Sequence, residues 1–292
     1  MNRNLRHAAQ RGDAAEVARM IRAGANVNSR DTYGYTPLWF AVYYGHLPVV
    51  ELLLVAPGID VNQESARTTP LQTAIQRDND EIALRLLAVP TIDVNKAPDG
   101  YAPILMAAMS DAKLPILEQI LSKPDVNVNV KNIRGDASAL CNAIRSKQYR
   151  TIERLLMHPA IDVNNTFDFG GGDFTPLMLA VDSPDERIVN LLLAHPKIDI
   201  HYTNSKGESA VSIATKGNEF SQGERKLIYK NILGILVPRI LAGKAWDRRR
   251  AAVTAWAAAQ AAEENQAGGV RSRKSRTHKR QHRKHQSRRR RM

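Results

Sequence analysis

The chain has 292 residues, with 42 Lys and Arg against 29 Asp and Glu and a formal net charge of +13. Hydrophobic residues make up 43% of it, enough for a packed core, and its one cysteine excludes a disulfide framework within the chain and favours a reducing compartment. The first residues lack the apolar core of a signal peptide, and no run approaches the roughly 18 apolar residues of a membrane span. We therefore expect an intracellular protein, cytoplasmic or nuclear or both, that does not span a membrane.

A pattern with a period near 33 residues runs through most of the chain. One apolar position recurs in steps of 33, 33, 33, 36, 37 and 34 residues, at Leu5, Leu38, Leu71, Ile104, Leu140, Leu177 and Val211. A Val-Asn pair keeps the same phase and is closed by Asn28, Asn62, Asn95, Asn129 and Asn164. Self-similarity at this period indicates a stacked solenoid.

The second repeat, residues 31–62, shows what one unit contains. Its Thr-Pro pair starts a helix, because proline at the first helical position loses no hydrogen bond and fixes φ. A short apolar helix, PLWFAVYYG, is followed by a second helix with the paired leucines of VVELLL and by an extended IDVN link. Such a unit is too thin to bury its own apolar face, so the units must stack.

The pattern G-x-T-P-L-x-x-A…G-H-L-x-V-V-x-L-L-L…V-N is nearly intact in residues 34–62 and resembles the ankyrin-repeat family, and the resemblance covers roughly residues 2–240, most of the chain. The resemblance implies an all-α repeat fold with binding of other proteins on a concave face. It implies an ankyrin solenoid of about seven helix–turn–helix units with hairpin loops, near 2–30, 31–62, 63–95, 96–129, 130–164, 165–201 and 202–241.

Four units depart from the family's usual G-A-D-V-N ending. They carry a P-x-I-D-V-N type of ending, with prolines at Pro57, Pro90, Pro159 and Pro196. This variant, together with a basic tail, is similar to ankyrin proteins of large DNA viruses. The two long steps mark insertions before the fifth and sixth units, and residues 165–174 form the longest of them.

The family's contact positions on the hairpins and first helices, carried onto this chain, predict a partner-binding row. It contains Tyr33, Tyr35, Tyr43, Tyr44, Arg67, Arg77, Tyr101 and Met109. Tyrosine beside arginine suits a partner with acidic and apolar elements, and Arg145 lies beside the same row in the fifth unit. The alternative is that some rings cover the stack and the arginines are ordinary surface. Trp39 falls in a slot that is usually buried and is expected in the core.

The insertion TFDFGGGDF holds Phe167, Phe169 and Phe174, three of the chain's five phenylalanines. We predict that its glycines make it flexible and that its rings add to the binding face, where long loops of a solenoid tend to lie. The alternative is that one or two rings tuck against the neighbouring unit. The glycines are not a phosphate cradle, because the Lys-Ser/Thr of a P-loop is missing.

The sequence contains no constellation for catalysis or metal binding, and we expect neither an enzyme nor a cofactor. The motifs HExxH, CxxC and GxSxG are absent. Cys141 falls in a first-helix slot of the fifth unit and is expected to be a buried structural thiol.

Two segments follow the repeats. Residues 225–241 carry apolar side chains at helical spacing and predict a last packed helix that bends or ends near Pro238. Residues 242–267 are rich in alanine and predict a further helix. That helix either shields the last repeat or docks into a partner, as in a ubiquitin-ligase substrate adaptor.

The end of the chain is a polycation. Residues 271–292 contain no acid and twelve basic residues: Arg271, Arg273, Lys274, Arg276, Lys279, Arg280, Arg283, Lys284, Arg288, Arg289, Arg290 and Arg291. Twelve of 42 leaves 30 Lys and Arg in residues 1–270 against all 29 Asp and Glu, so the body is nearly neutral. Because like charges repel, we expect residues 268–292 to be disordered.

Three functions follow from these features. The favoured one is a protein–protein interaction scaffold, monomeric, with the tail as a nuclear localisation signal read by an importin or as an electrostatic tether. The second is a nucleic-acid-associated protein whose tail binds phosphate backbones without sequence preference. The third is the substrate adaptor acting through residues 242–267.

Overall fold

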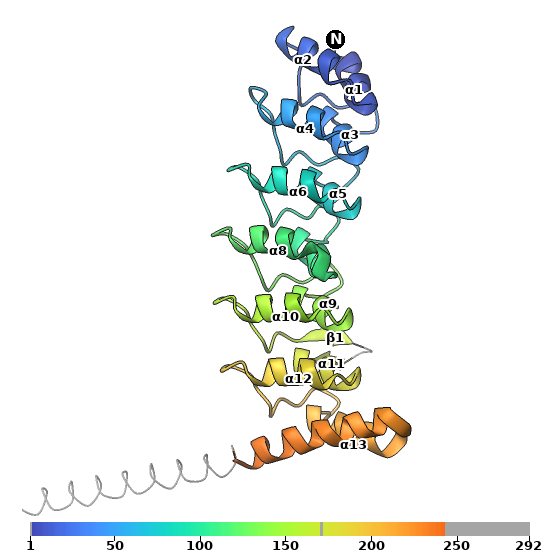
Figure 1. Ribbon diagram of the computed structural model, residues 1–292, viewed down its shortest axis with the longest axis vertical. Coiled ribbons are helices and arrows are strands. Elements are labelled where there is room, and N and C mark those ends of the chain that lie inside the picture. Colours follow the sequence, from blue (N-terminus) through green and yellow to red (C-terminus); the bar gives the residue numbers. More distant parts are fainter. Residues whose placement is uncertain (1, 170–171, 243–292) are drawn as a thin grey trace, which may run out of the picture. The chain divides into compact units, whose positions relative to one another are not determined.

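Helices occur in pairs, one pair for each predicted repeat (Figure 1). The computed structural model describes residues 2–169 and 172–242. The first helices are α1 (Asn2–Arg11), α3 (Pro37–Tyr43), α5 (Pro70–Gln76), α7 (Pro103–Ala107), α9 (Ala139–Arg145), α11 (Pro176–Asp182) and α13 (Ala210–Phe220). The second helices are α2 (Ala14–Arg22), α4 (Leu47–Leu54), α6 (Asp80–Leu87), α8 (Leu114–Leu121, after the 3₁₀ turn η1, Asp111–Lys113), α10 (Tyr149–Leu156), α12 (Glu186–Leu193) and a helix over residues 223–242. For this part of the chain, the prediction of about seven helix–turn–helix units is confirmed.

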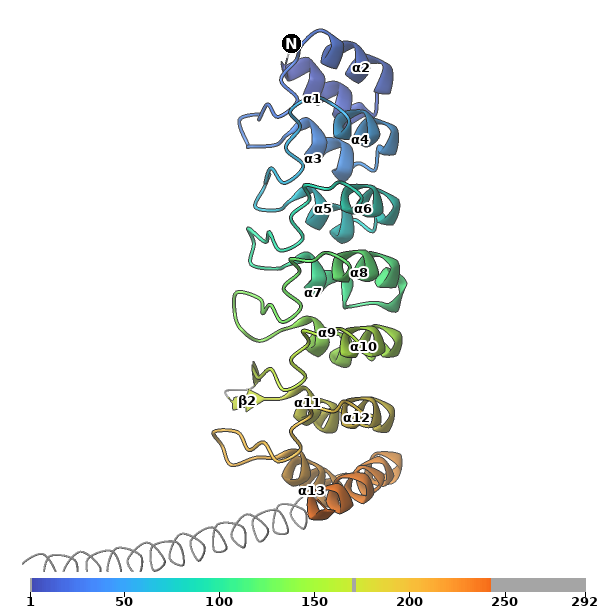
Figure 2. The same ribbon diagram turned by 90° about the vertical axis from the view of Figure 1, so that its left-hand side faces the viewer.

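The pairs stack in chain order, so that the first helices form a first row and the second helices form a second row (Figures 1 and 2). In the first row α1 packs against α3, α3 against α5, and so on to α13, while the second row runs from α2 to α12. The loops that connect successive pairs lie to one side of the helices, next to the first row (Figure 2).

The recurring apolar position explains why the units stack. From Leu5 in the first unit to Leu177 in the sixth, this side chain is at most 2% exposed. Full burial of a leucine contributes roughly 1.5–3 kcal/mol, and each unit obtains it only by lying against a neighbour. In the seventh unit Val211 is half-buried.

A hydroxyl side chain starts several of the first helices. Thr36 Oγ1 accepts a hydrogen bond from the Trp39 N–H at 3.1 Å, and Thr69 and Thr175 accept in the same way three residues on. Each threonine is followed by a proline at the first helical position, which is the arrangement that the Thr-Pro pattern predicts. Ala102 precedes α7 without a side-chain cap, and α7 has only 5 residues.

The asparagine that closes a repeat joins it to the next repeat. Asn28 Nδ2 donates to the Gly58 carbonyl oxygen at 2.7 Å, and its Oδ1 accepts from the Asp60 N–H at 2.9 Å. The same two bonds, at 2.7–2.8 Å, join Asn62 to Thr91 and Asp93, Asn95 to Asp125 and Asn127, Asn129 to Ala160 and Asp162, and Asn164 to Lys197 and Asp199. The asparagine marker therefore satisfies backbone groups that the loops would otherwise leave unpaired.

The insertion before the sixth unit contains a two-stranded antiparallel hairpin. Its strands are β1 (Phe167–Phe169) and β2 (Gly172–Phe174), with Phe167 opposite Phe174. Gly170 and Gly171 lie outside the described residues, and the rest of the predicted flexible loop is paired. Because side chains alternate along a strand, the three phenylalanine rings fall on one face of the hairpin.

The last helix pair is held by a close contact between its helices. Tyr229, on the helix over residues 223–242, is 4% exposed. Its ring lies so close to Gly217 of α13 that a Cβ on that glycine would stand 2.3 Å from it. The Tyr229 hydroxyl also donates to the carbonyl oxygen of Asp182 at 3.2 Å, which ties this helix to α11.

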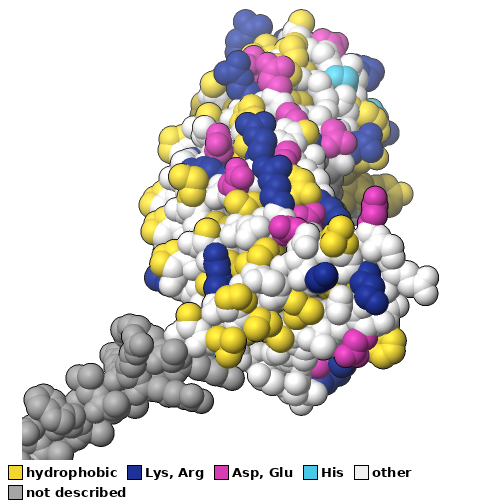
Figure 3. Space-filling view, turned by 60° about the horizontal axis from the view of Figure 1, so that its bottom comes forward, with side chains coloured by type: hydrophobic (Ala, Val, Ile, Leu, Met, Phe, Trp, Pro, Cys, Tyr) yellow, Lys and Arg dark blue, Asp and Glu magenta, His cyan; other side chains and the backbone are white. Residues whose placement is uncertain are grey.

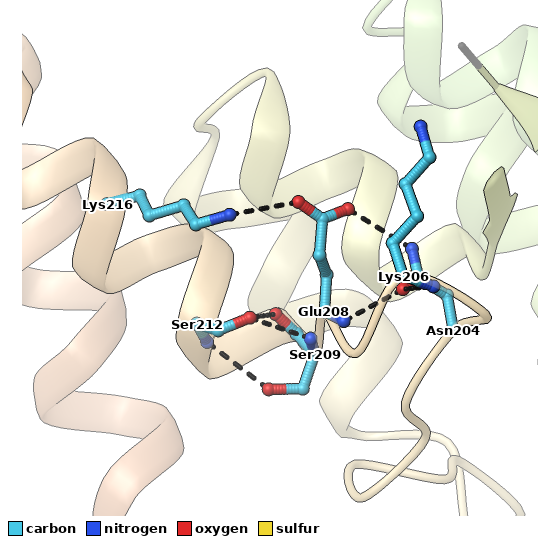
Figure 4. Close-up of polar contacts among 6 residues, drawn as sticks. All are labelled: Asn204, Lys206, Glu208, Ser209, Ser212 and Lys216. Carbon is cyan, nitrogen blue, oxygen red and sulfur yellow. Dashed lines mark hydrogen bonds and ion pairs between the residues drawn. The ribbon is translucent and has the colours of Figure 1, made fainter. Parts of the chain in front are cut away.

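Figure 4 shows the polar side chains that lead into α13. The Glu208 carboxylate accepts from Lys216 Nζ at 3.0 Å and from Asn204 Nδ2 at 3.2 Å, and the bond from Lys216 lowers the pKa of this carboxyl. Ser209 and Ser212 cap the helix reciprocally, each side-chain oxygen accepting from the other residue's N–H, at 3.2 and 2.8 Å. These bonds join the loop over residues 204–209 to α13, the helix that follows it.

The helix over residues 223–242 answers half of the prediction that it bends or ends near Pro238. It continues through that residue, so the end is excluded and the bend, which proline favours inside a helix, stays a prediction. At this end of the stack Phe220 is 84% and Leu227 58% exposed, and Figure 3 shows hydrophobic side chains gathered there beside charged ones.

The chain divides into two compact units, residues 1–234 and 235–292. The second unit is described only as far as residue 242. The expected basic tail (268–292) lies outside the described residues, as does all but the first residue of the alanine-rich segment (242–267).

Candidate protein-interaction surface

Five aromatic side chains of the second unit form a continuous series of neighbouring rings, which we call the aromatic stripe. Between ring centroids, Tyr33 lies 6.3 Å from Tyr35, Tyr35 lies 4.2 Å from Trp39, Trp39 lies 4.6 Å from Tyr43, and Tyr43 lies 5.1 Å from Tyr44. Trp39 and Tyr43 lie four residues apart on α3, which puts their rings about one helical turn apart, and Tyr35, just before the helix, also stacks on Trp39. Such ring pairs contribute about 0.5–1.5 kcal/mol beyond their buried area, so they hold one another in place.

The stripe is exposed at its ends and buried at its centre. Tyr33 is 80% and Tyr44 is 49% exposed, whereas Tyr35 and Tyr43 are half-buried. Trp39 is only 9% exposed, which confirms the prediction that it belongs to the core. Its indole N–H is buried without a hydrogen-bond partner among the described residues. A buried ring thus supports the exposed tyrosines.

One carboxylate stabilises the backbone turn at the start of the stripe. Asp31 Oδ1 accepts from the N–H of Tyr33 at 2.9 Å and from the N–H of Tyr35 at 2.8 Å, the kind of turn that aspartate favours. Two units along, Tyr101 occupies the position of Tyr35 and is half-buried. Its N–H donates to Asp99 Oδ1 at 2.9 Å, a carboxylate two residues before it rather than four.

Side chains from the first and third units flank the stripe. The Arg77 guanidinium lies over the Tyr43 ring, 4.5 Å from its centroid. Gln10 Nε2 donates to the Tyr44 hydroxyl at 3.5 Å. The surface centred on the second unit therefore extends over three consecutive units.

Two more of the predicted contact residues are exposed on the third and fourth units. Arg67 lies at the tip of the hairpin ahead of α5, with a φ of +63°. Met109 follows α7, is 52% exposed, and takes the slot that Tyr43 occupies two units earlier. Both belong to the side of the stack that the first row and its hairpins form.

The β1–β2 hairpin packs against an arginine of the fifth unit. Phe167 and Phe174 are 2% and 6% exposed, so the prediction that these two rings face a partner is wrong, because burial of their apolar area against the stack is favoured. Phe169 is half-buried. The Arg145 guanidinium lies 5.3 Å from the Phe167 centroid and 5.4 Å from that of Phe169. Sequence reasoning placed Arg145 beside the row but missed this pairing, for which the pattern holds no signal.

The second row has a different charge arrangement. Three of its arginines pair with glutamates of the preceding unit: Arg85 with Glu51 at 3.2 Å, Arg154 with Glu118 at 3.8 Å, and Arg187 with Glu153 at 3.7 Å. Such exposed pairs contribute at most about 1 kcal/mol each, and the two charges of each pair offset one another. Arg77 and Arg145, by contrast, contact rings and have no carboxylate within 4 Å among the described residues.

Nothing in the described residues is arranged for catalysis at a metal. No group of three His, Cys, Asp or Glu side chains in that part of the chain could hold a metal ion. Cys141 is buried, as predicted, and burial raises the pKa of its thiol to about 11, so the reactive thiolate is scarce at neutral pH. None of the described helices has the length and apolar character to cross a membrane.

Comparisons with known proteins agree on the fold. Family models described as ankyrin repeats match residues 20–74 and 104–204. The ankyrin repeat domain of human ASB11 is 21% identical, with a TM-score of 0.56, over 78% of this chain and 96% of that one. The ankyrin repeat domain of Bcl-3, a member of the IkappaB protein family, is 20% identical, with a TM-score of 0.64, over 80% and 97%. EF0377, an ankyrin repeat protein, is 23% identical, with a TM-score of 0.59, over 73% and 98%. The similarity to viral ankyrin proteins stays a prediction.

Proposed function

The chain belongs to the ankyrin-repeat family, and from that premise we propose that it is a non-enzymatic scaffold that binds a protein partner on its first row and hairpins. Ankyrin repeats generally mediate protein–protein interaction. The observation that carries the proposal is the aromatic stripe, in which the exposed Tyr33 and Tyr44 are backed by the buried Trp39.

The stripe has the physical properties of an interface anchor. Tyr33 and Tyr44 offer large rings with a polar tip. Because each side chain has few rotatable bonds, it loses little conformational entropy on binding. Tyr35 and Tyr43 stack on Trp39, which holds the surface in place before a partner arrives. Such preorganisation lowers the entropy that association loses.

The tail supports a separate role. Its twelve basic residues within 271–292 suit recognition by an importin or electrostatic tethering. A second candidate function, association with nucleic acid, is favoured by the same block of charge. In either case we assign partner recognition to the repeats and the charge-driven step to the tail.

Affinity capture with full-length variants tests the scaffold. The double variant Tyr33→Ala/Tyr44→Ala is compared with wild type and with Tyr202→Ala, a half-buried tyrosine in the link to the last unit. We expect the partner recovered by wild type and by the Tyr202 control to bind the double variant at least about tenfold more weakly. An unchanged partner set in the double variant would contradict the proposal.

Deletion of residues 271–292 separates the two roles. The shortened chain should keep its protein partner and lose nuclear accumulation. Nucleic-acid binding by the full-length chain should collapse between roughly 50 and 200 mM salt if the tail alone is responsible. Loss of the protein partner on deletion would show that the repeats do not carry recognition by themselves.

A further inference from the structure

Arg77 and Arg145 each lie against aromatic rings on the first row, Arg77 on the preceding unit and Arg145 on the hairpin of the following unit. Both are exposed, at the C-terminal ends of α5 and α9. Arg77 lies 4.5 Å over the Tyr43 ring, and Arg145 lies 5.3 Å from the Phe167 ring. A ring covers one face of the planar guanidinium and leaves its N–H edge able to donate to a ligand.

Neither guanidinium group has a carboxylate of the described residues within 4 Å. The acid next to Arg77, Asp78, pairs instead with Lys113 at 2.7 Å. Three arginines of the second row, Arg85 with Glu51 among them, pair with carboxylates of the protein itself. An arginine that is ordered against a ring and has no carboxylate suits an anion supplied by a partner, because its fork matches carboxylate geometry.

An apolar side chain lies between the two arginines. α7 packs between α5 and α9, and Met109, at the end of α7, is 52% exposed. Packed helices lie about 10 Å apart, which separates the backbones of the two arginines by about 20 Å. Because Arg77 lies on a ring of the second unit and Arg145 lies on rings of the β1–β2 hairpin, the guanidinium groups point away from each other and lie more than about 20 Å apart. An extended peptide covers about 26 Å in eight residues, and because its side chains alternate, residues i, i+4 and i+8 lie on one face.

We propose that units three to five bind an extended acidic segment of the partner, with carboxylates about eight residues apart on Arg77 and Arg145 and an apolar side chain midway between them on Met109. This inference rests on the proposed function and names the chemistry of the partner. Duplex nucleic acid fits the surface poorly, since it presents a charge about every 1.7 Å and requires a continuous basic face. Residues 1–270 instead balance 30 basic against 29 acidic residues.

Fluorescence anisotropy with a synthetic peptide tests the inference. The probe is fluorescein-labelled Gly-Glu-Ser-Ser-Ser-Leu-Ser-Ser-Ser-Glu-Gly, mixed with the full-length chain near physiological salt. One comparison peptide has glutamine for both glutamates, and another, Gly-Ser-Ser-Ser-Leu-Glu-Glu-Ser-Ser-Ser-Gly, keeps the charge but not the spacing. Because the basic tail attracts any acidic peptide, Arg77→Gln and Arg145→Gln are compared with Arg85→Gln, the second-row control, in the same full-length chain.

We expect saturable binding of the spaced peptide that falls roughly tenfold in each first-row variant and is unchanged in Arg85→Gln. Both comparison peptides should bind more weakly than the spaced one. Equal binding by all variants, equal binding of the adjacent-glutamate peptide, or no saturable binding below about 1 mM would each overturn the inference. Binding of a dT oligonucleotide that depends on the same two arginines would overturn it in favour of a phosphate ligand.

The inference and the proposed function fail separately. If the Tyr33→Ala/Tyr44→Ala variant loses the captured partner while Arg77→Gln and Arg145→Gln keep it, the acidic-segment inference is wrong and the scaffold stands. If the tyrosine variant keeps the partner, the proposed function fails whatever the peptides show. Circular dichroism of every variant excludes a loss of fold as the cause.

Discussion

The side-chain amide of Asn62 donates a 2.7 Å hydrogen bond to the carbonyl oxygen of Thr91, 29 residues further along the chain. Its Oδ1 accepts from the Asp93 N–H at 2.8 Å, so one side chain satisfies a donor and an acceptor of the next unit. The same pair of bonds recurs at each of the other asparagine markers. The stack is therefore held by polar bonds at its links as well as by apolar burial between its helices.

Asn62→Ala should destabilise the protein by about 1–3 kcal/mol, because it removes both bonds and leaves their backbone partners unsatisfied. The measurement is the free energy of unfolding in urea. Asn190→Ala, on the exposed face of α12, is the matched control and should change stability by less than about 0.5 kcal/mol. A similar small effect for both would mean that the inter-unit bonds carry little of the stability.

Trp39→Ala should cost about 3–5 kcal/mol, because it empties a buried site and removes the support of two stacked tyrosines. Tyr33→Ala should change stability by less than about 0.5 kcal/mol, since that ring is 80% exposed. Urea unfolding of both variants gives the comparison. A loss at Tyr33 as large as at Trp39 would identify the exposed ring as a structural element and remove it from the binding surface.

Two glycine-to-alanine changes should act with opposite signs. In Gly217→Ala the new Cβ would stand 2.3 Å from the Tyr229 ring, so the ring must shift and stability should fall by about 1–3 kcal/mol. In Gly234→Ala nothing lies within 4 Å of the new Cβ, and helix propensity should add up to about 1 kcal/mol. The urea midpoints of the two variants decide the matter, and a gain in both would refute the close helix contact.

Asp182 should make stability depend on pH. Burial raises the pKa of its carboxyl above the ordinary 3.8, and the charge of Arg225 opposes the rise. Between the unfolded and folded pKa values the folded state binds more protons, so stability falls as the pH rises through that window and stays lower above it. Asp182→Asn should therefore raise Tm at pH 7 and have little effect below about pH 3.

The control for this titration is Glu64→Gln, on an exposed loop, which should shift Tm little at either pH. A gain in Asp182→Asn that is equal at both pH values would assign the effect to packing or to hydrogen bonding of the amide. Absence of any gain at pH 7 would show that the interaction with Arg225 balances the burial of the carboxylate.

By itself the sequence determined the repeat period, the Thr-Pro helix starts, the buried position of Trp39 and the separation of a neutral body from a basic tail. These properties depend on residues within a few turns of one another or on composition, so the pattern carries them. The asparagine marker was visible in the sequence, but the bonds from Asn62 to the next unit were not.

Only the tertiary structure decided which rings of the insertion are buried, that Arg145 lies against Phe167, and that Tyr229 fills the space beside Gly217. In each case the two contacting residues belong to different helices or units. Which residues come into contact is determined by side-chain volume and strand pairing, and no local sequence pattern contains that information. The same reason explains why the charge contrast between the two rows appeared only once the helices were stacked: an arginine's partner is set by the unit beside it.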